Sequence, residues 1–265
     1  MDRLQMLYKE AGKMVKRSLL TLFMTILTAG SALAAIPLIT DDTGTQGKGK
    51  FQVELFAAYE HDNDKLVTSK NSDLSATLTY GIIDPIDIVL SVFYQTWHSD
   101  DADSVEKGSG IGDLAIEAKW KFYEKDGLSV ALKPGFTIPT GDEEAGLSAG
   151  RMTYYLYFIA SKEMDTKAFH FNLAFIRNEN EGDERKDIWH ASLAATVDVA
   201  RNLKLVGDVG IDTNSDRASM TPPVYILGGF IYSPVENFDI GLGVKGGLTN
   251  TETDIAVRGG ITFRF

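Results

Sequence analysis

The sequence predicts a closed, antiparallel, up-and-down transmembrane β-barrel of about 12 strands that follows an N-terminal signal peptide. Three observations predict this all-β fold. Apolar and polar residues alternate with a period of two along most of the chain. The alternating segments are long enough to cross a bilayer as tilted strands. The connections between these segments alternate between short turns and mostly long polar loops, as they do in outer-membrane barrels.

The first 34 residues have the features of a secretory signal. Basic residues precede an apolar run from Leu19 to Ala29, and Ala32-Leu33-Ala34 places small residues at the positions that a signal peptidase recognises. An uncleaved anchor helix is the alternative, but the apolar run is shorter than the roughly 18 residues expected of a membrane span. Met14 is an alternative start to Met1, because the leader before it is unusually long.

Composition excludes several classes of protein. The chain has no cysteine, so it is not a disulfide-stapled scaffold. Only one stretch, near the N-terminus, is apolar enough to approach a helical membrane span. The net charge of −11 argues against nucleic acid as a partner, because phosphate binding needs clustered Lys and Arg. An exported, acidic chain without cysteine fits the bacterial envelope.

The alternation is clearest from Gly112 to Phe122. Leu114, Ile116 and Trp120 fall on one face of an extended chain, whereas the charged residues fall on the other. The same pattern predicts strands near residues 50–60, 72–81, 86–98, 111–123, 128–138, 151–162, 169–178, 188–199, 203–213, 224–233, 238–249 and 254–265. Most of these are about twice as long as the 5 or 6 residues typical of strands in soluble proteins.

The predicted connections are of two kinds. Short turns are expected at 82–85, 124–127, 163–168, 200–202 and 234–237, and longer polar loops at 61–71, 99–110, 139–150, 178–187 and 214–223; the loop at 250–253 is short. In outer-membrane barrels the short turns are periplasmic and the long loops are external. Both termini are therefore expected in the periplasm.

Aromatic residues on the apolar faces form two groups, one near each end of the predicted strands. Such girdles mark the two interfaces of a membrane with water, so outer-membrane lipid is an expected partner. The alternative is a soluble β-sandwich with an aromatic core, which rarely needs such long uniform strands. The chain ends in Phe265 after alternating Ile261 and Phe263, as does a terminal strand that barrel-insertion machinery recognises.

Four stretches resemble a known family: Pro37 to Leu55, Gly110 to Tyr123, Lys133 to Asp142, and Gly146 to Gly150. Together they are similar to the outer-membrane proteins labelled "MetA-pathway of phenol degradation", which are described as transporters. The similarity runs across nearly the whole chain after the signal. It implies an outer-membrane barrel and the passage of small organic or aromatic compounds, and it implies no catalytic residues.

The expected domains are a signal peptide at 1–34, a periplasmic linker or short plug at 35–49, and a barrel at 50–265. The expected function is a channel for passive uptake of small, aromatic or hydrophobic organic molecules, with no enzyme activity, cofactor or metal. Polar inward residues suit an open lumen or a plugged one equally. The candidate pore-lining residues are Glu54, Phe93, Glu117, Lys133, Tyr155, Tyr157, Asn172, His190, Asp208, Lys245 and Arg258.

The outward residues of the strands at 111–123 and 128–138 are all even-numbered, and this parity predicts the register between the two strands. A tight turn between the strands at 111–123 and 128–138 pairs Phe122 with Leu128, which sets Glu117 opposite Lys133. The neighbouring register places Lys119 opposite Lys133, and like charges in direct opposition are unfavourable. We therefore expect the register that pairs Glu117 with Lys133.

Several motifs match known sites only in part. Gly44 to Lys50 spells GxxxxGK and Gly241 to Gly246 spells GxGxxG, but no helix is predicted after either to bind a phosphate. The segment from Asp212 to Asp216 imitates a calcium loop but lacks its glycine. Gly146 to Gly150 spells GxSxG, so a lipase-like hydrolase using Ser148 with His170 or His190 is the alternative function. A structural or adhesive barrel is the third.

Overall fold

The computed structural model describes residues 36–64, 67–101, 104–143, 145–148, 150–180 and 184–265. The expected signal peptide lies outside the described residues. The chain divides into two units, Met1–Gly30 with Phe265 and Ser31–Arg264, and the second of these contains the whole sheet. The strands and connections of the described residues all belong to that unit.

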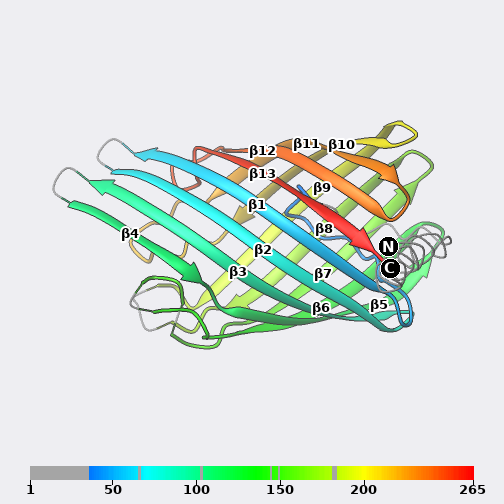
Figure 1. The fold of residues 1–265 in the computed structure, drawn as a ribbon, viewed down its shortest axis with the longest axis horizontal. Coiled ribbons are helices and arrows are strands. Elements are labelled where there is room, and N and C mark those ends of the chain that lie inside the picture. The colour runs from blue at the N-terminus through cyan, green and yellow to red at the C-terminus, as the bar shows by residue number, and fades with distance from the viewer. Residues whose placement is uncertain (1–35, 65–66, 102–103, 144, 149, 181–183) are drawn as a thin grey trace, which may run out of the picture. The chain divides into compact units, whose positions relative to one another are not determined.

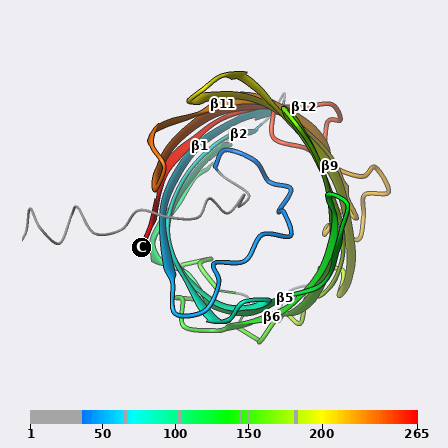
Figure 2. The ribbon, with the colours of Figure 1, turned by 90° about the vertical axis from the view of Figure 1, so that its right-hand side faces the viewer.

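The sheet is antiparallel and closes on itself, as Figures 1 and 2 show. Its first strand pairs with its last, Gln52 opposite Arg264 through to His61 opposite Ile255. The strands are β1 (Phe51–Asp64), β2 (Val67–Ile83), β3 (Ile86–Asp101), β4 (Ser104–Ile111), β5 (Leu114–Lys125), β6 (Leu128–Ile138), β7 (Tyr154–Met164), β8 (Lys167–Arg177), β9 (Asp187–Ala200), β10 (Leu203–Asp212), β11 (Val224–Val235), β12 (Phe238–Gly247) and β13 (Ile255–Arg264). The prediction of a closed antiparallel barrel is confirmed.

The barrel has twelve strand positions because β4 and β5 share one of them. Both pair with β3, and a break at Gly112 separates them. At this break the Gly112 amide still donates to the Phe93 carbonyl (2.9 Å), and the pairing with β3 then shifts by one residue before Ala115. The predicted strand near 111–123 thus corresponds to β5, the second part of a longer strand that is interrupted after β4.

Two of the predicted long loops are wrong. The segments expected as loops at 61–71 and 99–110 are largely strand, since β1 and β2 stay paired to Asp64 and Val67, and β3 and β4 to Asp101 and Ser104. Their residues are polar on both faces, so the alternation that marks a membrane-facing strand is lost although the backbone ladder continues. These two hairpins project beyond the apolar wall at the end of the barrel that carries the long connections, here called the loop end. The opposite end is the turn end.

The wall is apolar outside and polar inside. Along β1, Leu55 and Tyr59 are exposed outward, whereas Gln52 is buried inward. Aromatic pairs at the turn end include Phe51 with Tyr80 and Phe238 with Phe263; Phe175 and Trp189 pair at the loop end. This arrangement fits a closed wall in lipid, where every backbone group is paired within the sheet and hydrocarbon faces hydrocarbon.

The predicted register between β5 and β6 is wrong. Glu117 lies opposite Gly135, and Lys125, not Phe122, lies opposite Leu128. The turn contains only Asp126 and Gly127, both with positive φ, so the ladder extends further than expected before it reverses. A bulge between Lys121 and Tyr123 then shifts the pairing by one residue.

The observed register therefore places Lys119 opposite Lys133, because Glu117 faces Gly135 and Trp120 faces Leu132. Glu117 still meets Lys133 diagonally, with 3.4 Å between its Oε1 and the lysine Nζ. Direct opposition of two lysines needs a compensating anion.

The loop between β6 and β7 folds against the inner face of β3. The Trp97 indole, which points inward, donates to the Ala145 carbonyl (2.9 Å), and the Gly141 amide donates to Asp113 Oδ1 (3.1 Å). Leu147 is buried beneath these contacts. This loop thus narrows the loop end of the barrel.

In the part of the chain that the structure describes, no helix has the length and hydropathy needed to cross a membrane.

An arginine in the middle of the outer wall is expected to destabilise the protein. Leu242 lies midway along β12 and points outward, so Leu242→Arg should lower the free energy of unfolding in phospholipid vesicles by about 2–4 kcal/mol. The control is Val105→Arg in the projecting β3–β4 hairpin, which should change the value by less than about 0.5 kcal/mol. Urea titration measures both, and equal effects would contradict a lipid-embedded wall.

Candidate functional site: the lumen and the N-terminal segment

Residues 36–50, here called the N-terminal segment, lie inside the barrel (Figure 2). Their sequence is rich in Thr, Asp and Gly and lacks the alternation of a strand. Gly47 and Gly49 have positive φ and turn the chain into β1. The turn packs tightly against Gly81 of β2, where a Cβ would lie 1.9 Å from the Gly47 carbonyl oxygen.

A glycine-lined recess in the wall receives the start of the segment. A Cβ at Gly241 would lie 1.7 Å from the Ile36 carbonyl oxygen, and one at Gly243 would lie 2.8 Å from Pro37 Cγ. Only the absence of side chains at these positions lets the segment approach β12 so closely. The glycines that spell GxGxxG therefore contact the chain itself.

Asp208 of β10 binds the segment through both oxygens. Its Oδ2 accepts the amides of Ile39 and Thr40, each at 2.8 Å, and its Oδ1 accepts the Thr40 hydroxyl at 2.7 Å. Tyr225 donates to the same Oδ1 at 3.4 Å. Hydrogen bonds to an ionised carboxylate are stronger than neutral ones, so Asp208 is a principal anchor.

Asn172 of β8 holds the backbone of Asp41 at both of its polar groups. The Asp41 amide donates to Asn172 Oδ1, and Asn172 Nδ2 donates to the Asp41 carbonyl (2.8 and 2.7 Å). An amide side chain that pairs with a backbone in this way fixes its position in the lumen.

The Asp41 side chain supplies the anion between the two opposed lysines. Lys119 Nζ lies 2.9 Å from Asp41 Oδ1, and Lys133 Nζ lies 2.9 Å from Oδ2. Burial alone would raise the pKa of the Asp41 carboxyl, but the two ammonium groups outweigh it and hold that pKa below its usual range. The carboxylate of the segment thus offsets the repulsion that the strand register creates.

The rest of the segment is bonded to the turn-end half of the wall. The Thr43 hydroxyl shares a hydrogen bond with Ser129 of β6, and the Thr43 amide donates to Ser161 Oγ of β7 (3.1 Å). The Gln46 amide donates to both oxygens of Asp87 (3.2 and 2.9 Å). The Gln46 amide, which belongs to the GxxxxGK stretch, is therefore engaged by a carboxylate of the chain.

A cavity of about 230 Å³ remains between the segment and the wall of β1, β2, β3, β5 and β6. Its lining is mostly polar and includes Gln52, Glu54, Thr77, Ser91 and Glu117. It is too narrow for a drug-sized ligand, whose pockets usually measure about 300–1,000 Å³. With the segment in place, the cavity suits water and small ions.

The predicted pore-lining residues divide into three groups. Lys133, Asn172, Asp208 and Arg258 bond the N-terminal segment directly, the last through its Nε to the Pro37 carbonyl (3.3 Å). Glu54 and Glu117 line the cavity beside it. The others lie elsewhere on the inner wall: Phe93, Tyr155, Tyr157, His190, which bonds Asp212, and Lys245, which pairs with Glu60 and Glu252.

Sequence reasoning missed the segment's other main partners. Lys119 and Asp87 were assignable to the lumen by parity, but nothing in the alternation distinguishes them from other inward polar residues. The only signal was the cluster of hydroxyl and carboxyl groups from Thr40 to Thr45, which directly precedes the first strand.

The two histidines proposed for a hydrolase are engaged with partners other than Ser148. His170 Nδ1 bonds Ser161 (2.9 Å), and His190 bonds Asp212 through Nδ1 (2.9 Å) and Ser192 through Nε2 (3.0 Å). Ser192, His190 and Asp212 are thus hydrogen-bonded to one another as the members of a Ser-His-Asp triad are. Ser192, however, is only 3% exposed. It lines neither the cavity beside the segment nor another cavity, which lies at the loop end of β9 and β10.

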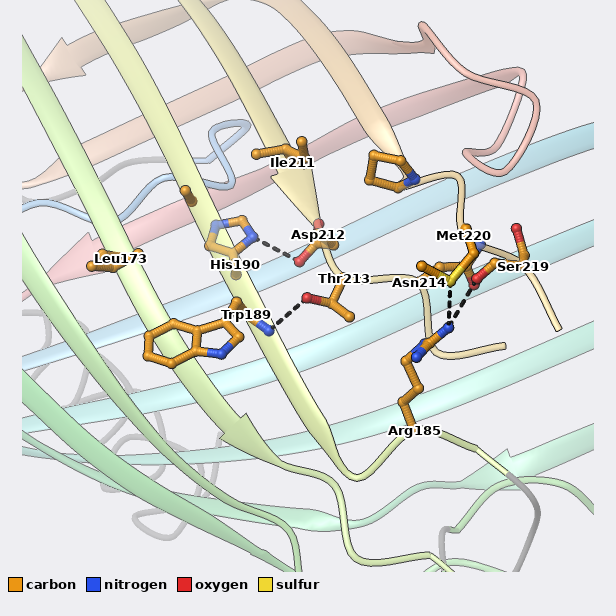
Figure 3. Close-up of a pocket in the computed structure, with 12 residues that line it drawn as sticks. Leu173, Arg185, Trp189, His190, Ile211, Asp212, Thr213, Asn214, Ser219 and Met220 are labelled. Carbon is orange, nitrogen blue, oxygen red and sulfur yellow. Dashed lines mark hydrogen bonds and ion pairs between the residues drawn. The ribbon is translucent and has the colours of Figure 1, made fainter. Parts of the chain in front are cut away.

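A second cavity, of about 380 Å³, lies at the loop end of β9 and β10 (Figure 3). Leu173, Trp189 and Ile211 form its apolar side. Arg185 fixes the covering loop by donating from Nη2 to the Ser219 carbonyl (3.1 Å) and to the Met220 sulfur (3.5 Å). Among the described residues, no group of three or more metal-ligating side chains could hold an ion.

Comparison with known proteins agrees with this architecture. The crystal structure of the COG4313 outer membrane channel from Pseudomonas putida F1 has a TM-score of 0.66 and 12% identity, covering 84% of this chain and 98% of that one. The KdgM porin has a TM-score of 0.52 and 8% identity, covering 81% and 99%. The KdgM porin in complex with disordered oligogalacturonate has a TM-score of 0.50 and 10% identity, covering 79% and 99%. At these identities the likeness shows a shared fold. A separate comparison with curated proteins found no match to the sequence.

The closed wall, its apolar exterior and this likeness define an outer-membrane β-barrel. The family model described as "Putative MetA-pathway of phenol degradation" matches residues 35–265. The chain therefore belongs to that family, as its resemblance predicts.

Proposed function

We propose that the protein is a channel for passive uptake of small organic molecules, aromatic ones included, in which the N-terminal segment is a plug. The observation that carries the proposal is the closed wall around a polar lumen, filled in part by a chain segment that side chains of the wall bind. When the segment detaches from the wall, solutes pass through the lumen. Their path runs along inward polar and aromatic groups that include Glu117, Tyr157 and His190.

The parts of the chain take their roles from this proposal. Residues 1–34 are the signal peptide, 35–49 the plug and 50–265 the barrel, with its loop end outside the cell and its turn end in the periplasm. Phe265 and the strand before it are the contact for the barrel-insertion machinery. The name of the Pseudomonas putida relative, an outer membrane channel, supports the same function.

The proposal includes that the protein is not an enzyme. Burial of the Ser192 hydroxyl supports this, because a nucleophile has to reach its substrate. The other alternative, a structural or adhesive barrel, needs no solute path and gives no account of a polar cavity inside the wall.

A reversible tether tests the role of the segment. The chain has no cysteine, so Thr43→Cys with Ser129→Cys introduces a single possible disulfide between the segment and β6. The two hydroxyls share a hydrogen bond, which places the side chains within reach of one another. In planar bilayers, the oxidised protein should conduct less than the reduced protein by severalfold, because only the reduced segment can leave.

Thr43→Cys alone is the matched control, and its conductance should not respond to the reductant. If the tethered and released forms conduct equally, the segment does not limit flow. If neither form, nor the wild type, passes any ion or small organic solute, the channel function itself is wrong.

A further inference from the structure

We infer that Asp41 occupies the binding site of a solute carboxylate, and that the preferred solutes are small aromatic acids. This inference rests on the proposed function as a channel. It concerns the place where Asp41 meets Lys119 and Lys133, and the aromatic side chains beside it.

The two lysines form an anion site that belongs to the wall. The β5–β6 register sets Lys119 and Lys133 opposite one another on the inner face, and their side chains are 8% and 15% exposed. Glu117 lies 3.4 Å from Lys133 Nζ, whereas Lys119 has no carboxylate of the wall among its described ion pairs; Glu54 and Asp87 line the same cavity at longer range. Lys119 is therefore the ammonium group that is left without a close carboxylate when Asp41 is absent. A barrel with this register favours a bound anion at that point whenever Asp41 is absent.

Asp41 meets the lysines as a ligand does. Each carboxylate oxygen contacts one ammonium group at 2.9 Å. The residue belongs to the N-terminal segment and not to a strand, and hydrogen bonds, these ion pairs and packing hold that segment to the wall. If the segment leaves, a solute carboxylate can make the same two contacts.

Aromatic rings lie next to the lysine pair. Lys133 Nζ is 5.2 Å from the centre of the Tyr157 ring, and the rings of Tyr155 and Tyr157 meet edge to face at 5.9 Å. The Tyr155 ring packs against Gly135, where a Cβ would be 2.3 Å from the ring. A flat solute with one carboxylate can therefore bind the lysines while its ring packs on the tyrosines.

The test uses Asp41→Asn in the full chain, which keeps the shape of the side chain and removes its charge. We expect this variant to bind benzoate about tenfold more tightly than wild type in calorimetric titrations, since one charge-assisted competitor is lost. Benzyl alcohol and benzylamine are the neutral and cationic probes, and their binding should not improve.

Asp198→Asn is the control, because it removes one inward carboxylate at a distance from the lysine pair. Asp198 pairs with Lys204 at 3.8 Å and has no hydrogen bond to the segment among the described contacts, so this variant should leave benzoate binding unchanged. Asp41→Asn combined with Lys119→Met should lose the gain, while Lys133 keeps its partner Glu117. Heat-dependent mobility in SDS gels verifies that each variant is folded.

The outcomes separate the inference from the proposed function. Equal gains for benzoate, benzyl alcohol and benzylamine, or no gain for benzoate, would overturn the carboxylate site even if the protein conducts. A selective gain for benzoate supports the site. Vesicle swelling with the same probes then tests whether the bound solute is also transported, and its failure would count against the channel alone.

Discussion

Replacing Asp208 with alanine is expected to release the N-terminal segment and to raise the single-channel conductance. Asp208→Ala removes the acceptor of the Ile39 and Thr40 amides and of the Thr40 hydroxyl. Hydrogen bonds to a charged group contribute about 1.5–3 kcal/mol each. Because water replaces part of this loss, we expect a shift of about 2 kcal/mol, or roughly thirtyfold, toward the released state.

Two measurements follow the release. Conductance in planar bilayers reports the open path, and maleimide labelling of Thr45→Cys, which is buried in the wild-type lumen, reports exposure of the segment. Asp198→Ala is the control, because Asp198 pairs with Lys204 at 3.8 Å and has no hydrogen bond to the segment among the described contacts. Unchanged conductance and labelling in Asp208→Ala would show that this carboxylate does not anchor the segment.

Adding a single methyl group to the glycine recess is expected to raise the single-channel conductance by a similar factor. In Gly241→Ala the new Cβ would lie 1.7 Å from the Ile36 carbonyl oxygen, so the segment has to move. Overpacking of this kind costs about 1–3 kcal/mol. The wall loses no hydrogen bond, so the cost falls on the bound segment and conductance should rise.

Gly228→Ala is a closely matched control for this variant. Gly228 lies on the neighbouring strand β11, and a Cβ there would meet nothing within 4 Å. Both substitutions change the backbone freedom of a strand glycine in the same way. If the two variants conduct alike, contact between the segment and the recess has no influence on flow.

Much of the fold could be predicted from the sequence because the membrane imposes a simple pattern. The alternation of Leu114, Ile116 and Trp120 against charged residues locates β5, and the same rule assigns Asp208 and Asn172 to the lumen. The ends of the first hairpins were not predictable in this way. Beyond the lipid, both faces of a strand meet water, and the alternation disappears while the ladder continues.

The site was less predictable, because it depends on contacts between distant parts of the chain. Local pairing rules favour Glu117 opposite Lys133, and no local rule includes a carboxylate that arrives from Asp41. The bulge between Lys121 and Tyr123 shifts the pairing by one residue, and a register predicted from alternation alone assumes a ladder without a bulge. Parity therefore gives the face of each residue but not its partner.

The bonds of the N-terminal segment have a consequence for barrel assembly. The segment contacts β12 through Ile36, β10 through Thr40 and β3 through Gln46, so its partners lie on both sides of the junction between β1 and β13. While the first and last strands are still apart, these bonds would hold the two flanks of the sheet near each other. We therefore expect the segment to favour closure of the barrel.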